Sequence, residues 1–272
     1  MPFQLAGEAG HPDRANEDFA AVTADGVVLL DGVSAPHGVD TGCAHGVAWY
    51  TRRLGGLLAA GLAGDRGLGD VLAEAVTAAS ALHGPGCDLG NQETPSATVV
   101  LVRFAGDHLD YLVLSDSVLL TEHADGTVHA IADTRLDHLR RRLASAPLTA
   151  AAGTPERAAE LSERGRAIRS HRNVPGGFWT AGADPRAGAE ALTGKLSLDG
   201  LAGFAAMTDG ATRGVELFGS QTWRDCYALA AGDGPAALID HVRALERADA
   251  ARRAFTPGKL HDDATVVTWS PA

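Results

Sequence analysis

Four short acidic motifs are spread along nearly the whole chain, and each one lies where an apolar run ends or begins. The motifs are Asn16-Glu17-Asp18, Asp31-Gly32, Thr208-Asp209-Gly210 and His261-Asp262-Asp263-Ala264-Thr265. Short apolar runs with such boundaries are typical of buried strands. The pattern therefore predicts several strands whose ends carry carboxylates to one metal site.

The first two motifs flank a predicted hairpin. Residues 19–23 and 27–30 are apolar and lie on either side of Asp25-Gly26. This dipeptide favours a type I′ turn, because both central residues tolerate positive φ. Such a hairpin would place the Asn16-Glu17-Asp18 motif beside Asp31.

Two later apolar runs carry the remaining acidic motifs. Residues 203–207 end just before Asp209, and residues 264–269 begin just after Asp262 and Asp263. If these strands are neighbours, five or six carboxylates converge. Like charges so close raise each other's pKa, so the group would hold either protons or cations. Hard oxygen ligands favour Mg²⁺ or Mn²⁺.

Two further motifs, Ser96-Ala97-Thr98 and Ser115-Asp116-Ser117, lie in order between the acidic ones. In order and spacing, the six motifs together resemble the metal-dependent type 2C Ser/Thr protein phosphatases, from about the tenth residue to the C-terminus. The resemblance implies an α+β fold, a four-layer αββα sandwich in which two antiparallel β-sheets pack face to face. Helices would flank the sheets, and the metals would lie at one edge.

The resemblance also implies a role for each matching residue on the N-terminal side of the site. Asp31 would bridge two metal ions, and the carbonyl of Gly32 would reach one of them. Glu17 would lie next to one ion directly or through water. Asp18 would orient metal-bound water from behind it.

The C-terminal motifs would complete the centre. Asp209 and Asp262 would ligate the ion on the other side, and Asp116 would hold water or help to bind a third, weaker ion. The implied cofactors are two Mg²⁺ or Mn²⁺ ions, with a third as an option. The implied reaction is hydrolysis of phosphoserine or phosphothreonine in a phosphorylated protein, by a metal-activated water and without a phosphoenzyme.

The phosphate clamp is where the chain departs most from the family pattern. The family commonly places an Arg four residues before the Glu of its first motif, where its planar fork binds phosphate. Here that position is Asp13, and Arg14 lies one residue nearer. Arg14 is either the clamp on a shortened loop or a solvated loop arginine.

The segment Arg172-Asn173-Val174-Pro175-Gly176-Gly177-Phe178-Trp179 offers a second clamp, Arg172. Its Pro and Gly residues suit a shaped loop that forms a lip over the site. The alternative is a turn whose aromatic pair is anchored in the core.

Other departures leave a second function open. Ser115 replaces the usual Gly of a Gly-Asp-Ser motif, and Asp263 stands where Asn is frequent. Asp263 either adds negative charge to the site or caps a turn. His37 is out of register with a His of some relatives, so we expect a loop histidine.

The alternative function is a catalytically weak or inactive relative that binds a phosphorylated partner as a regulatory module. Carboxylates buried without metals would cost several kcal/mol, which favours catalysis.

Length and composition are consistent with one domain over residues 1–272, with 135–180 as a candidate helical flap. The formal net charge of −11 argues against nucleic acid as a partner. No signal core or membrane-length apolar stretch is present in the sequence, so we expect a cytoplasmic protein that does not bind membranes. Neither the three cysteines nor the histidines show metal-ligand spacing, and free thiols are expected.

Periodicity and turn residues predict the remaining elements. Helices are predicted for residues 44–63, 68–82, most of 135–172, and 229–253 with an interruption at 232–235. Strands are predicted for residues 98–104, 109–114 and 118–122, with a hairpin turn at Asp125-Gly126.

Overall fold

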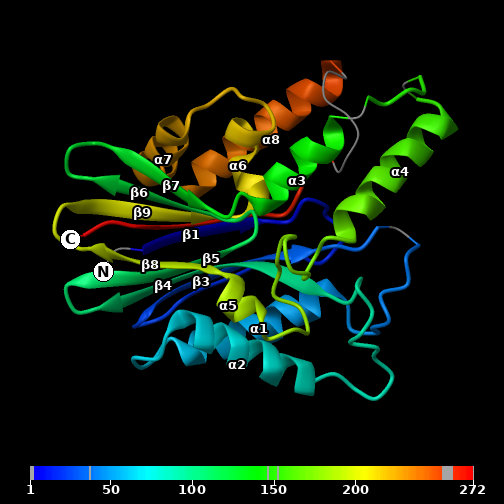
Figure 1. The fold of residues 1–272 in the computed structure, drawn as a ribbon. Coiled ribbons are helices and arrows are strands. Elements are labelled where there is room, and N and C mark those ends of the chain that lie inside the picture. Colours follow the sequence, from blue (N-terminus) through cyan, green and yellow to red (C-terminus); the bar gives the residue numbers. More distant parts are fainter. Residues whose placement is uncertain (1–2, 37, 146, 152, 253–259, 272) are drawn as a thin grey trace.

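The structure is a computed structural model that describes residues 3–36, 38–145, 147–151, 153–252 and 260–271. Two five-stranded antiparallel sheets pack face to face (Figure 1). One sheet has the order β1 (Phe3–Glu8), β10 (Ala264–Trp269), β9 (Leu201–Met207), β6 (Val118–His123) and β7 (Val128–Ala132). The other has the order β2 (Phe19–Val22), β3 (Gly26–Val33), β4 (Ser96–Ala105), β5 (His108–Leu114) and β8 (Leu192–Ser197).

Helices cover the outer face of each sheet (Figure 1). The sheet that contains β3 is covered by α1 (Val47–Gly61) and α2 (Leu68–Ala81), with the short α5 (Ala187–Glu190) beside α2. The sheet that contains β10 is covered by α6 (Asp209–Glu216), α7 (Trp223–Gly232) and α8 (Pro235–Arg252). The predicted four-layer α+β sandwich is therefore confirmed.

Strand β3 shows why these residues form this fold. Val28 and Leu30 pack against the helices α1 and α2, whereas Val27 and Leu29 pack against the opposite sheet. All four side chains are buried, because a central strand of a sandwich has an apolar neighbour on both faces. Each such side chain contributes about 1.5–3 kcal/mol of burial free energy.

The predicted hairpin forms, but its turn lies one residue earlier than expected. Phe19 pairs with Leu30, and the amide of Thr23 donates to the carbonyl of Gly26 at 2.8 Å. Asp25 and Gly26 lack the positive φ of a type I′ turn, so that turn type is wrong. Gly26 belongs to β3, where a Cβ atom would lie 1.9 Å from the carbonyl oxygen of Val102 on β4. The glycine is required by this close approach.

Most other predicted elements are confirmed within a few residues, including the interruption of the last helical segment at 232–235. Helix α7 begins earlier than predicted, at Trp223. The final residue of the predicted segment, Arg253, lies outside the described residues, as does His37. The turn at Asp125-Gly126 is confirmed, with φ of 78° at Gly126. Strands β1, β7 and β8 and helices α5 and α6 were not predicted from the sequence.

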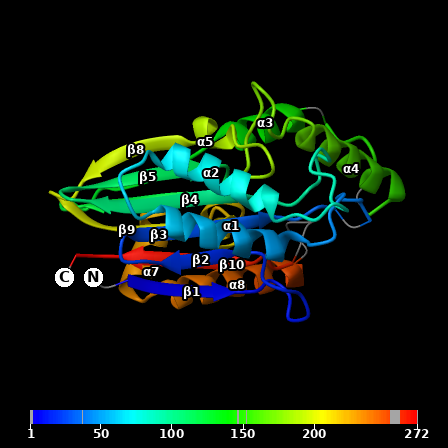
Figure 2. The same cartoon turned by 90° about the horizontal axis from the view of Figure 1, so that it is seen from below.

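The segment 135–180 contains α3 (Arg135–Ala144) and α4 (Pro155–Arg169). Both helices lie at one end of the sandwich, beyond the strands (Figures 1 and 2). Helix α4 has no buried residue, which fits a flap better than a core helix. Within the described residues, none of the helices combines the length and the apolar character that crossing a bilayer requires.

Candidate metal centre

The C-terminal end of β3 carries Asp31 and Gly32. Asp31 lies on the same face of the strand as Val27 and Leu29, which pack against the other sheet, whereas Gly32 faces α1. Asp31 lies opposite Thr98 in the register of β3 and β4. Gly32 has no space for a side chain, because a Cβ atom would lie 2.5 Å from Val47 Cγ1 and 2.7 Å from the carbonyl oxygen of Glu17. This close packing brings the first two acidic motifs together, as the sequence predicts.

Asp116 lies where the chain crosses from β5 in one sheet to β6 in the other. The preceding residue, Ser115, has φ of 67°, the left-handed conformation that glycine adopts most easily. Ser117 is buried, and its Oγ lies 2.5 Å from Thr98 Oγ1. The Ser96-Ala97-Thr98 and Ser115-Asp116-Ser117 motifs are therefore in contact through their side chains, and Thr98 lies opposite Asp31 on the neighbouring strand.

Neighbouring strands of the other sheet deliver Asp209 and Asp262. Asp209 follows β9 and begins α6, and Asp262 precedes β10, which pairs with β9. Thr208 links these strands to Asp18: its Oγ1 donates to Asp18 Oδ2 at 3.0 Å and accepts from the Thr265 amide at 2.9 Å. The register of β9 and β10, together with this hydrogen bond to Asp18, thus brings three of the acidic motifs together.

The carboxylates meet at one cavity of about 250 Å³. Its acidic wall consists of Asp31, Asp116, Asp209 and Asp262. Its other wall includes three arginines from the flap side, Arg140, Arg169 and Arg172. Four of the sequence-predicted carboxylates therefore converge, and three arginines line the same cavity.

Burial and mutual repulsion shift the acidic groups strongly. Burial, followed by the charge of Asp209, raises the pKa of Asp31 well above its usual range. Burial raises the pKa of Asp209 to about 8, with added repulsion from Asp116. Burial raises the pKa of Asp18 to about 7. These carboxylates are held where their ionised forms need a nearby positive charge.

A divalent cation fits this group of oxygen donors. Asp18 Oδ1 is buried and has no hydrogen-bond partner, whereas its Oδ2 is bonded to Thr208. Carboxylate oxygens are the donors preferred by Mg²⁺ and Mn²⁺. Bound cations would neutralise the repulsion that raises the pKa values of Asp31 and Asp209.

Glu17 and Arg14 lie on a neighbouring cavity of about 570 Å³, which shares Ser34 and Asp262 with the first one. Ser34 Oγ donates a short hydrogen bond to Glu17 Oε2. Arg14 is exposed and does not line the cavity that contains Asp31. Arg14 therefore lies near the predicted site but on its outer side.

Arg172 does line the Asp31 cavity, and its segment forms the predicted lip. Its guanidinium is 5% exposed and lies 3.2 Å from Glu93 Oε2. Arg169 Nε lies 2.8 Å from the other oxygen of Glu93. Phe178 and Trp179 are buried, so the anchored aromatic turn and the lip occur together.

Asp263 has a structural role. Its two carboxylate oxygens accept hydrogen bonds from the amides of Gly10 and Glu17, both at 2.7 Å. This agrees with the capping role considered for Asp263. The carboxylate holds the loop before β2 against the loop before β10.

A buried charge network behind Asp262 was not predicted. Glu246 lies 2.9 Å from Arg243 Nη1 and 2.5 Å from His261 Nδ1, and it also pairs with Arg213. Arg243 Nη2 donates to the carbonyl oxygen of Asp262 at 2.6 Å. Arg243 and Glu246 are three residues apart, a spacing equally typical of a surface pair, so their positions in the chain do not indicate burial.

Arg140 was also missed. Its Nη1 lies 3.2 Å from Asp116 Oδ2 and 3.6 Å from Asp137 Oδ1. Its positive charge opposes the rise in the pKa of Asp209. The arginine-rich composition of α3 was the one available signal, and it did not single out this residue.

Several solved structures with the same fold are of phosphatases. The serine/threonine phosphatase Stp1 from Staphylococcus aureus is 12% identical, with a TM-score of 0.58 over 99% of this chain and 94% of that chain. The serine/threonine phosphatase PstP/Ppp from Mycobacterium tuberculosis is 17% identical, with a TM-score of 0.56 over 98% of this chain and 97% of that chain.

A structure of the PstP catalytic domain in complex with two manganese ions is also similar. It is 17% identical, with a TM-score of 0.56 over 98% of this chain and 96% of that chain. No family model matches the sequence, and no curated protein matches it. At these identities the comparisons establish the fold, which is that of the type 2C Ser/Thr phosphatases.

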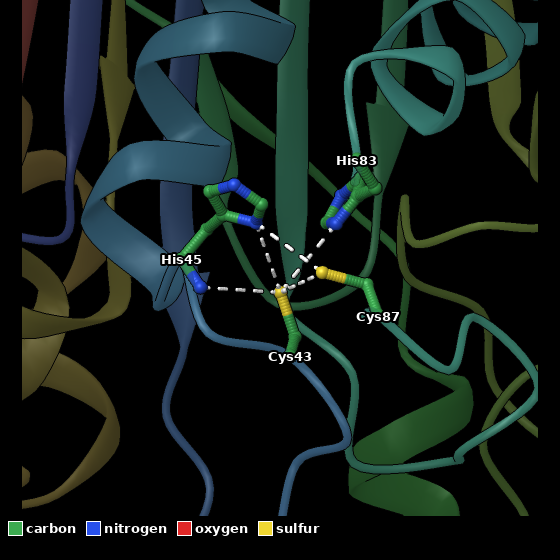
Figure 3. Close-up of side chains that lie close together, drawn as sticks. All are labelled: Cys43, His45, His83 and Cys87. Carbon is green, nitrogen blue, oxygen red and sulfur yellow. Dashed lines mark hydrogen bonds between the residues drawn. The ribbon is translucent and has the colours of Figure 1, made fainter. Parts of the chain in front are cut away.

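A second group of ligand-type side chains lies outside the carboxylate cavity. Cys43 and His45 precede α1, and His83 and Cys87 follow α2 (Figure 3). One ligand atom from each residue lies within 4.8 Å of the other three. Their spacing in the sequence did not indicate this grouping. Cys43, Cys87 and Cys226 are free cysteines, as expected. Cys226 lies elsewhere, buried beside Met207.

Proposed function

We propose that the protein is a metal-dependent Ser/Thr protein phosphatase that hydrolyses phosphoserine or phosphothreonine. The observation that carries this proposal is the convergence of Asp31, Asp116, Asp209 and Asp262 on one cavity with arginines opposite. A structural role does not account for this group, since carboxylates crowded together with raised pKa values destabilise a fold unless cations neutralise them. The shared fold with Ser/Thr phosphatases supports the same conclusion.

Each acidic residue has a proposed part in holding Mg²⁺ or Mn²⁺. Asp31 and the Gly32 carbonyl would contribute ligands to two ions. Asp209 and Asp262 would complete the ligands of one of them, and Asp116 would help to hold a third, weaker ion. When bound, the ions supply a nucleophilic water at neutral pH and neutralise charge on the phosphoryl oxygens.

The outer residues hold the centre in place. Ser34 fixes the carboxylate of Glu17, which is assigned to one ion, through their hydrogen bond. Thr208 fixes Asp18, which is assigned to orient water with its free oxygen. No side-chain nucleophile is needed, so no phosphoenzyme forms.

The substrate is a phosphorylated protein, and an arginine captures its phosphate. Arg14 is accessible on the outer cavity, whereas Arg172 lies on the inner cavity and is already paired with Glu93. We assign the clamp to Arg14, because its side chain is exposed at the outer cavity, whereas Arg172 is buried and paired with Glu93. A cytoplasmic location stays a prediction.

Hydrolysis of p-nitrophenyl phosphate and of phosphoserine and phosphothreonine peptides tests the proposal. We expect turnover with Mn²⁺ or Mg²⁺ and none with EDTA. The matched variants are Asp31→Asn, in the cavity, and Asp199→Asn, in the exposed loop before β9. Absence of turnover with every metal and peptide, in folded wild-type protein, would reject catalysis.

The second candidate is a phosphoprotein-binding module with little or no activity. The displacement of Arg14 favours it, because Arg14 lines the outer cavity and not the one that contains Asp31, so a phosphate bound to Arg14 could lie away from the carboxylates. Isothermal titration with a phosphopeptide distinguishes the two. A binding module retains the peptide unchanged, whereas the phosphatase releases inorganic phosphate.

A further inference from the structure

Four side chains from two loops converge in the geometry of a tetrahedral metal site. The sulfurs of Cys43 and Cys87 are 3.7 Å apart. His45 Nδ1 lies 3.6 Å from the Cys43 sulfur and 3.4 Å from the Cys87 sulfur, and His83 Nδ1 lies 3.4 Å from the Cys43 sulfur (Figure 3). We propose that these four residues bind one zinc ion, outside the carboxylate centre and independently of it.

The distances match zinc coordination. Zinc lies about 2.3 Å from thiolate sulfur and about 2.0 Å from imidazole nitrogen, so a regular tetrahedron has S–S edges of about 3.8 Å and S–N edges of about 3.5 Å. The observed separations of 3.7 Å between sulfurs and 3.4–3.6 Å between sulfur and nitrogen agree with these edges. Four of the six ligand pairs thus already have tetrahedral spacing, and the ligand atoms of the other two pairs lie within 4.8 Å of each other.

Neighbouring groups already orient the ligands. The ring of His45 stacks on Trp49 with centroids 4.1 Å apart, and His83 meets the edge of Trp49 at 4.9 Å. The backbone amide of His45 donates to the Cys43 sulfur at 3.4 Å. Such an amide stabilises a thiolate, the form that binds metal. Cys43, His45 and His83 are thus held in place by contacts that do not involve an ion.

The donor set selects zinc over the ions expected at the carboxylates. Two sulfurs and two imidazoles in a tetrahedron suit zinc, whereas Mg²⁺ and Mn²⁺ prefer oxygen. Four protein ligands leave no open position, which is typical of a structural site. A disulfide would need the sulfurs about 2.05 Å apart, whereas they are 3.7 Å apart. It would also not explain why two imidazoles converge on the same sulfurs.

The zinc would fasten two loops beside the carboxylate cavity. The first begins at Ser34, which lines that cavity, and the second carries Glu93. The loops also share backbone contacts: the Asp88 amide donates to the Gly42 carbonyl at 2.7 Å, and Thr94 Oγ1 donates to the Thr41 carbonyl at 3.2 Å. Glu93, on the loop that follows Cys87, holds Arg169 and Arg172 at the cavity. The ion therefore stabilises the loop that positions these arginines.

Metal analysis of the untagged full chain tests the site. We expect about one zinc per chain in the wild type after dialysis against metal-free buffer, and about tenfold less in the double variant Cys43→Ser/Cys87→Ser. Cys226→Ala is the matched thiol control, and Asp31→Asn is the control for the carboxylate centre. Both should retain the zinc. Equal zinc in the double variant and the wild type would overturn the proposal.

Two further measurements test the site even if the double variant fails to fold, because they do not use that variant. Cobalt in place of zinc should give the absorption of a thiolate-to-cobalt charge transfer, and this absorption should persist in Asp31→Asn. Mercurial titration of the thiols should release the zinc in step with two cysteines. A Cys43–Cys87 disulfide in protein alkylated at lysis, or cobalt spectra without thiolate bands, would contradict the site.

Discussion

The two candidate metal sites are built in opposite ways. The carboxylate centre lies between two sheets, where strand register fixes Asp31 and Asp209. The Cys–His cluster, Cys43 with His45, His83 and Cys87, lies on loops outside the sheets and is fixed by ring stacking and loop hydrogen bonds. The first holds hard oxygen donors, and the second holds sulfur and nitrogen.

The contrast shows what each site requires from its metal. In the carboxylate centre, burial, with added repulsion from Asp116, raises the pKa of Asp209 to about 8, so bound cations would offset the unfavourable free energy of the ionised carboxylates. In the Cys–His cluster, the proposed zinc would hold two loops together that have little apolar surface to pack against each other. Loss of metal should therefore abolish chemistry at one site and loosen structure at the other.

The largest expected effect is the loss of turnover in Asp31→Asn. Removing the central carboxylate should lower kcat/KM by about 1000-fold, since several kcal/mol of charge stabilisation disappear. Mn²⁺ binding should weaken in parallel, whereas zinc content should not change. Steady-state kinetics and metal titration measure these effects. Wild-type turnover at ordinary Mn²⁺ levels would sink the assignment of Asp31.

The second effect concerns the charge network behind Asp262. Glu246→Gln removes the carboxylate that Arg243 and Arg213 share, and breaking a buried pair in this way costs about 3–5 kcal/mol of unfolding free energy. Because Arg243 also holds the Asp262 carbonyl, Mn²⁺ affinity should fall by about 10–100-fold.

Urea denaturation and Mn²⁺ titration of Glu246→Gln test this network. The matched control is Glu163→Gln, an exposed glutamate on α4. If the Glu246→Gln variant bound Mn²⁺ as tightly as the wild type, the network would be structural only. An unchanged unfolding free energy would contradict the burial argument itself.

The sequence predicted the carboxylate centre because its signals are local. Asp31 and Asp209 each end an apolar strand, and that boundary is visible in a few residues. Helix α6 was missed because it has only eight residues, two of them glycine, which propensity disfavours. Strand β1 was missed because four of its six residues are exposed on an edge strand.

The Cys–His cluster could not be predicted in the same way. Cys43 and Cys87 are 44 residues apart, and each has only one ligand partner nearby in the chain. Neither Cys-x-His nor His-x-x-x-Cys is a recognised zinc pair by itself. The pairs meet because α1 and α2 pack side by side, so that the start of one faces the end of the other. This relation exists only in three dimensions.

The third effect locates the phosphate clamp relative to the two sites. Arg14 belongs to the carboxylate side, whereas Arg172 is linked through Glu93 to the loop that carries Cys87. Losing a charge-assisted pair costs about 1.5–3 kcal/mol, so Arg14→Ala should lower kcat/KM by about tenfold or more, mainly through KM. Arg172→Ala should mainly lower the melting temperature.

Kinetics and thermal melts of both variants measure the clamp, and Arg14→Lys separates the planar fork from the charge. Near-wild-type kinetics in both would show that metals alone hold the phosphate. A large kinetic effect from Arg172→Ala alone would assign the phosphate clamp to Arg172 in the inner cavity. The clamp would then be linked, through Glu93, to the loop that carries Cys87.

The fourth effect is a pH dependence confined to the carboxylates. The folded-state pKa values of Asp18, about 7, and Asp209, about 8, exceed the ordinary value of 3.8. The folded state therefore binds more protons, and its stability falls as pH rises from about 4 towards 8. Cation-stripped protein should thus melt several degrees lower at the upper end of this range.

Thermal melts of stripped protein at several pH values test this dependence, with Asp209→Asn as the comparison. The variant should show a shallower fall. Mn²⁺ should release protons on binding and restore the melting temperature at high pH. A stripped protein equally stable across the range, with no proton release, would contradict the shifted pKa values.

The smallest effect concerns backbone strain, which the two sites handle differently. Beside the Cys–His cluster, Gly46 takes φ of 74° and ψ of 170°, a region almost restricted to glycine, so Gly46→Ala should lower the free energy of unfolding by about 1–3 kcal/mol.

At the carboxylate centre the residue in the left-handed conformation is Ser115, whose backbone strain is about 1–2 kcal/mol. Ser115 also has a weak contact, since its Oγ lies 3.3 Å from Asp116 Oδ1. Ser115→Ala loses this contact and keeps the strain, whereas Ser115→Gly loses both. Urea denaturation should therefore find Ser115→Gly more stable than Ser115→Ala by up to about 1 kcal/mol, after the greater freedom of glycine in the unfolded chain is subtracted. If Ser115→Gly is no more stable than Ser115→Ala, the serine is accommodated without strain, and the departure from glycine costs the carboxylate centre nothing.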